Sequence, residues 1–158
     1  MCCRRPGLYR KFFRNKEEDQ NRTDIEKSLG YLLKEKQNKC IIHGLWGGEI
    51  DHCLGKLFAI SHYAEKIQIT AYHVDEKKQL VVPLINKHQF TLKPKTTISL
   101  ISTTNAEVTS QGLEWELNRM QINPSTKQSL RNRSKNSFIE ITAHEGSSFM
   151  IINDNLQS

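Results

Sequence analysis

Short stretches of alternating apolar and polar residues dominate the chain after Lys39. In residues 67–72, for example, Ile67, Ile69 and Ala71 alternate with glutamine, threonine and tyrosine. Alternation with a period of two is typical of a half-buried β-strand. About seven or eight such stretches, with turn residues roughly every eight to twelve positions, favour an antiparallel β-sandwich or a partly open barrel over a parallel α/β sheet.

The expected strands lie at residues 40–46, 67–72, 80–85, 96–103, 106–110, 113–117, 137–143 and 148–152. We expect residues 66–85 to form one hairpin, and the last two strands to form another around His144–Gly146. Residues 54–64 could form a strand or a short helix, because the apolar run is too short to decide. Trp115, between Glu114 and Glu116, is expected in the core.

One amphipathic helix is expected before the strands, over about residues 24–36. Thr23 and Glu26 have the spacing of a capping box, in which each side chain bonds the other residue's backbone. Apolar residues then recur at helical spacing, at Ile25, Leu29, Leu32 and Leu33. The sequence therefore predicts a mainly β protein: a basic leader at residues 1–22, and a single β-rich domain at 23–158 that begins with this helix.

The net charge of the chain lies in its first sixteen residues. The chain has 23 Lys and Arg against 17 Asp and Glu, and six of the bases lie in residues 1–16, which contain no acid. The remainder is therefore neutral. The basic residues of the leader are Arg4, Arg5, Arg10, Lys11, Arg14 and Lys16. Charge confined to one short segment indicates a contact or an address rather than a property of the fold.

Several interpretations of the leader remain open. Its bases, together with Phe12 and Phe13, suit an anionic membrane surface, and Cys2 and Cys3 are candidates for lipidation. The same residues could bind a phosphate backbone and stack on bases, form a transit peptide, or form a solvated tail. An apolar signal-peptide core is missing, so we expect a cytoplasmic protein, in part membrane-associated, that is not secreted by that route.

Residues 40–53 hold the densest set of reactive side chains. Cys40, His43, His52 and Cys53 could ligate zinc, which binds thiolates and imidazoles. His52 and Cys53 are adjacent, however, so on a strand they would point to opposite faces. Alternatively, a nucleophilic Cys53 could be activated by a nearby histidine. The alternative to a zinc or nucleophilic site is that Cys40 is simply a small apolar residue of the core.

Residues 42–46, with the sequence IHGLW, are similar to the first active-site segment of the T2 ribonucleases. The resemblance implies that His43 performs general acid–base catalysis. The sequence departs from that family at Gly47, where the family has proline, and its second motif has only Glu114-Trp115 as a counterpart.

These patterns predict a non-catalytic binding or adaptor domain, recruited to an anionic membrane by its leader, with a protein partner and no cofactor. The alternatives are a hydrolase or nuclease with a Cys/His site in residues 40–53, and a nucleic-acid-binding protein that uses the leader.

Overall fold

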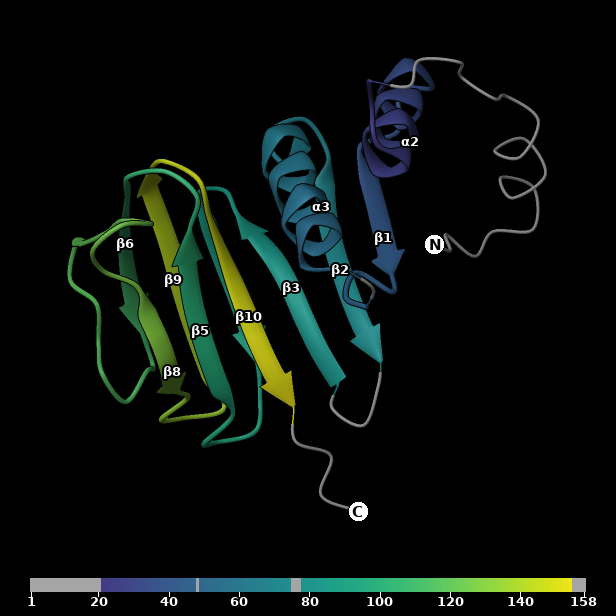
Figure 1. Ribbon diagram of the computed structural model, residues 1–158. Coiled ribbons are helices and arrows are strands. Elements are labelled where there is room, and N and C mark those ends of the chain that lie inside the picture. The colour runs from purple at the N-terminus through teal and green to yellow at the C-terminus, as the bar shows by residue number, and fades with distance from the viewer. Residues whose placement is uncertain (1–20, 48, 75–77, 155–158) are drawn as a thin grey trace. The chain divides into compact units, whose positions relative to one another are not determined.

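The computed structural model describes residues 21–47, 49–74 and 78–154. The chain divides into two compact units, Met1–His73 and Val74–Ser158, and each is described by itself (Figure 1). The expectation of a single domain over residues 23–158 stays a prediction. No helix in these three ranges is long and apolar enough to cross a membrane.

The described residues of the first unit form two helices and two strands. These are α2 (Asp24–Lys34), β1 (Lys39–His43), α3 (Ile50–Tyr63) and β2 (Gln68–Val74). β1 and β2 lie side by side and are parallel, from Lys39 opposite Gln68 to His43 opposite Tyr72 (Figure 1). β1, α3 and β2 therefore form a strand–helix–strand crossover, the usual connection between neighbouring parallel strands.

The helix predicted at the start of the folded region is confirmed as α2. The Thr23 side chain and backbone exchange hydrogen bonds with Glu26, so the capping box is present. Leu29 and Leu32 are buried by this helix, as the apolar stripe predicts. The helix ends at Lys34, two residues before the predicted end, because Lys36 adopts a left-handed backbone with φ 55°.

The ambiguous segment at residues 54–64 belongs to α3. Its buried residues Ala59, Ile60 and Tyr63 have the three- and four-residue spacing of one helix face. The opposite side of this helix exposes Ile50, Leu54 and Phe58. Because both sides of this short helix carry apolar residues, the periodicity of the sequence could not distinguish a helix from a strand here.

The second unit consists of eight antiparallel strands: β3 (Lys78–Leu84), β4 (Lys87–Thr91), β5 (Thr97–Ser102), β6 (Ala106–Gln111), β7 (Met120–Ile122), β8 (Ser129–Arg133), β9 (Phe138–Glu145) and β10 (Ser148–Asp154). One sheet of this unit has the order β3-β10-β5-β8, and the other has the order β4-β9-β6-β7. The predicted mainly β sandwich with a preceding helix is confirmed, and the sheets do not close into a barrel.

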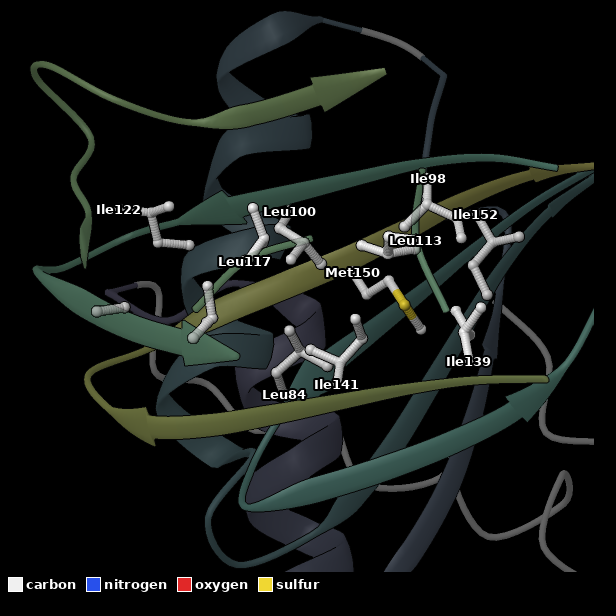
Figure 2. Close-up of a cluster of buried hydrophobic side chains, with 12 residues drawn as sticks. Leu84, Ile98, Leu100, Leu113, Leu117, Ile122, Ile139, Ile141, Met150 and Ile152 are labelled. Carbon is white, nitrogen blue, oxygen red and sulfur yellow. The ribbon is translucent and has the colours of Figure 1, made fainter. Parts of the chain in front are cut away.

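The core of the second unit lies between its two sheets. Figure 2 shows Leu100 and Met150 of one sheet and Ile141 of the other pointing into this space. All three side chains are fully buried. Leu113 and Leu117, from the segment between β6 and β7, complete the same cluster. Close packing of branched side chains from both sheets holds the sandwich together.

Three local expectations for the second unit are wrong. β9 and β10 do not pair as a hairpin: β9 pairs with β4 and β6, whereas β10 pairs with β3 and β5. Residues 113–117 form a loop with one bridge, from Leu113 to Ser134. The sequence predicted no strand at residues 129–133, where β8 lies, because this outer strand exposes most of its side chains.

Candidate functional site

The loop between β1 and α3 is held in a fixed conformation. Gly44 and Gly47 have φ of 75° and 107°, values that side-chain-bearing residues rarely adopt. The Gly44 N–H donates to the Tyr72 carbonyl at 3.0 Å. Between the glycines, Leu45 is fully buried, and its carbonyl accepts a hydrogen bond from Lys56 Nζ at 3.3 Å. The loop is therefore tied to β2, to the core of its unit and to α3.

This loop carries the chain into the N-terminus of α3. Glu49 precedes the helix and makes no side-chain capping bond, while Asp51 Oδ1 accepts from the His52 N–H at 2.7 Å. The first backbone N–H groups of a helix attract anions, phosphates above all. In parallel α/β arrangements, ligands bind at the carboxyl ends of the strands, which is where this loop lies. The arrangement can therefore bind a phosphate group.

The residues predicted from the Cys/His segment are spread over this region. His43 is exposed at the end of β1 and stacks on Tyr72, with ring centroids 5.7 Å apart. Cys40 is buried on β1, and Cys53 is a partly exposed free thiol in the first turn of α3, next to the exposed His52. Across residues 21–47, 49–74 and 78–154, no three metal-ligating side chains come together. The structure thus gives no support to a zinc site here.

The predicted leader contacts lie outside the described residues. They are Arg4, Arg5, Arg10, Lys11, Phe12, Phe13, Arg14 and Lys16, with Cys2 and Cys3 as the lipidation candidates.

Trp115 is a second candidate binding feature, in the other unit. We expected it in the core, but its side chain is 57% exposed. Its backbone is nevertheless fixed, because its N–H donates to Asn132 Oδ1 at 3.2 Å and its carbonyl accepts from Asn132 Nδ2 at 2.7 Å. An exposed indole on a fixed backbone is a platform for aromatic or cationic ligands. The flanking acids Glu114 and Glu116 were the available sign that the segment lies at the surface.

A cavity of about 700 Å³ adjoins the Trp115 loop. Leu117 and Ile122 belong to its lining together with Asn118, Thr126 and Lys127. The lining thus combines apolar and hydrogen-bonding side chains within the second unit.

Comparison with known proteins shows what the fold is similar to. No protein-family model matches the sequence, and neither does any curated protein. A thiamine pyrophosphokinase from Bacillus subtilis matches 87% of this chain with a TM-score of 0.72 and 21% identity. The fold is similar to that of thiamine pyrophosphokinases. A second such enzyme, from Geobacillus thermodenitrificans, matches 88% of the chain with a TM-score of 0.71 and 20% identity.

A probable thiamine pyrophosphokinase from Staphylococcus saprophyticus matches 82% of the chain with a TM-score of 0.58 and 25% identity. The chain spans 65% of the length of the Bacillus and Geobacillus proteins and 60% of the Staphylococcus protein.

This similarity corrects the function predicted from the sequence. A non-catalytic, membrane-recruited and lipidated binding or adaptor domain is the wrong description, because the solved structures that share the fold are named as enzymes. They are named as pyrophosphokinases and not as hydrolases, nucleases or nucleic-acid-binding proteins. The resemblance to T2 ribonucleases is confined to the five residues 42–46, and segments this short recur by chance in unrelated structures.

Proposed function

We propose that this chain is a thiamine pyrophosphokinase or the larger part of one. The reaction transfers a diphosphate group from a nucleoside triphosphate to the hydroxyl group of thiamine, releasing the nucleoside monophosphate. The observation that carries the proposal is the fold match, which extends over 87–88% of the chain in the two most similar structures named above. Because identity is only 20–21%, the match supports the activity through shared architecture rather than through shared residues.

The β1–α3 loop supplies the chemistry that the phosphate donor needs. A diphosphate group is highly anionic, and the dipole at the N-terminus of α3 favours such a ligand. Gly44 and Gly47 are exposed and have no side chain, so a ligand can approach the backbone of the loop at these two residues. Asp51, exposed in the first turn, is placed to interact with a cation that accompanies the phosphates.

Trp115 supplies a surface that suits thiamine. Thiamine consists of a pyrimidine ring linked to a positively charged thiazolium ring. Both rings can stack on an indole face, and the positive charge is attracted to the electrons of that face. Among the described residues of the second unit, Trp115 is the most exposed large aromatic side chain.

The proposal is tested by following thiamine diphosphate formation by chromatography, with the purified chain, thiamine, a nucleoside triphosphate and Mg²⁺. We expect turnover by the wild type, a loss of at least tenfold in kcat/KM for Asp51→Asn, and a raised KM for thiamine in Trp115→Ala. Glu65→Gln and Phe58→Ala change an exposed acid and an exposed aromatic outside the β1–α3 loop and outside the Trp115 loop, and serve as controls. A folded wild type that shows neither turnover nor thiamine binding would refute the proposal.

An intracellular location fits this proposal, because nucleoside triphosphates are abundant inside cells and Cys40 and Cys53 are free thiols. The protein partner expected from the sequence stays a prediction.

A further inference from the structure

Glu116 makes a dense set of hydrogen bonds at the base of the Trp115 loop. One carboxylate oxygen, Oε1, accepts from the Gly112 N–H at 2.7 Å and from the Leu113 N–H at 3.1 Å. The other, Oε2, accepts from the Ser110 hydroxyl at 2.5 Å. The same hydroxyl accepts from the Leu117 N–H at 2.8 Å. A single carboxylate thereby joins both ends of the loop.

These hydrogen bonds join the two ends of the loop at residues 110–117. Ser110 is the penultimate residue of β6, and its N–H also donates to the Leu117 carbonyl at 2.8 Å. Gly112 must be glycine at this point, because its φ is 90° and an added Cβ would collide with the Phe138 carbonyl. The Gly112 N–H is fixed in direction by that tight packing, and only a side chain acceptor reaching back from residue 116 satisfies it.

Trp115 lies between the two clamped ends. Asn132 of β8 hydrogen-bonds the backbone of Trp115. Glu116 hydrogen-bonds the N–H of Gly112, at the start of the loop that contains Trp115. Hydrogen bonds to a charged acceptor are stronger than neutral ones. The indole therefore stays exposed while its Cα position is fixed from two directions, which reduces the entropy lost when a ligand stacks on it.

We propose that Glu116 is a positioning residue, which rests on the proposed function above: it pre-organises Trp115 for the aromatic, cationic substrate. The role is indirect, because both carboxylate oxygens are engaged by the protein's own donors. Glu114, two residues earlier, is exposed, and it is its backbone N–H that donates to the Arg133 carbonyl, at 2.8 Å.

The experiment uses the full chain in which Trp46→Phe leaves Trp115 as the only tryptophan, since the sequence has two. Steady-state fluorescence anisotropy then reports the mobility of Trp115, and titration with thiamine gives its Kd. Glu116→Ala removes every acceptor, Glu116→Gln keeps one carbonyl oxygen for the Gly112 and Leu113 N–H groups, and Glu114→Gln is the matched control. KM for thiamine and kcat are measured for each variant in the chain with Trp46 intact.

We expect Glu116→Ala to lower the anisotropy of Trp115 and to weaken thiamine binding by about tenfold or more, with kcat nearly unchanged. Glu116→Gln should restore most of both properties, and Glu114→Gln should match the wild type. A folded Glu116→Ala variant with unchanged anisotropy and thiamine Kd would overturn the proposal. So would equal effects of Glu116→Ala and Glu114→Gln. Failure of the wild type to bind thiamine refutes the proposed function, whereas the anisotropy still decides whether Glu116 orders Trp115.

Discussion

Asn132 pairs with Trp115 through both ends of its carboxamide. Its Oδ1 accepts from the Trp115 N–H and its Nδ2 donates to the Trp115 carbonyl, at 3.2 and 2.7 Å. Asn132 is only 3% exposed, so its buried side chain satisfies both backbone groups of Trp115. The backbone of the exposed tryptophan is thus held by a buried side chain of the second unit.

Asn132→Ala should therefore destabilise the protein by about 1–3 kcal/mol, because the N–H and carbonyl of Trp115 and the N–H of Arg133 lose their partner. Urea denaturation at neutral pH measures the difference in unfolding free energy. Asn136→Ala changes an exposed asparagine nearby and should have little effect. A cost for Asn132→Ala no larger than that of the control would mean that water replaces the carboxamide at no loss.

Gly112 and Gly55 should respond in opposite directions to alanine. Gly112 has φ 90° and lies against the Phe138 carbonyl, so Gly112→Ala should cost on the order of 1–3 kcal/mol. Gly55 lies in α3 with no atom near the position of a Cβ, so Gly55→Ala should stabilise the helix by about 0.5–1 kcal/mol. Thermal denaturation of the two variants compares them, and destabilisation by Gly55→Ala would contradict the open space seen beside α3.

His88 should make stability depend on pH. Burial lowers the pKa of His88, whose ring also accepts a hydrogen bond from the Ile85 N–H at 3.1 Å. The unfolded chain then takes up this proton at a higher pH than the folded chain does, so stability is complete above the ordinary pKa of about 6.5 and falls as the pH drops below it. Urea midpoints at pH 7.5 and 5.5 test this.

His88→Gln should reduce that loss of stability between pH 7.5 and 5.5, because glutamine carries no titrating proton there. His144→Gln, which removes an exposed histidine, is the comparison. If the two variants lose stability equally on acidification, the pH dependence does not arise at His88.

Thr23 should stabilise α2 through its cap. Thr23→Ala removes the hydroxyl from the capping box and should cost about 1 kcal/mol at pH 7. The hydrogen bond from the Thr23 side chain, followed by that from its backbone, lowers the pKa of Glu26. This contribution is present above the ordinary pKa of the carboxyl group and is lost as the pH falls through the lowered value.

The difference in stability between wild type and Thr23→Ala should therefore shrink below about pH 4. Urea titrations at pH 7 and pH 3.5 give both numbers. Ser137→Ala, at an exposed hydroxyl, is the control and should show no such change. If wild type and Thr23→Ala differ in stability by the same amount at both pH values, the contribution of the cap does not depend on the ionisation of Glu26.

Local signals predicted α2 and most strands, because a capping box and alternating burial are visible in a single segment. They could not predict that β1 and β2 are parallel, since an isolated strand carries no record of its neighbour's direction. The assignment of α3 would have made the glycines at 44 and 47 a recognisable strand-to-helix loop. Trp115 was misplaced because alternation around it is satisfied equally by a strand and by a loop whose leucines at 113 and 117 enter the core.

β10 lies between β3 and β5 and pairs with both. The strand that comes latest in the described chain is thus a central strand of its sheet, and β3 and β5 share it as their common partner. The second unit consequently cannot assemble progressively as it is synthesised. It must wait until about residue 154 has left the ribosome, and its folding rate should be that of a protein dominated by contacts between distant parts of the sequence.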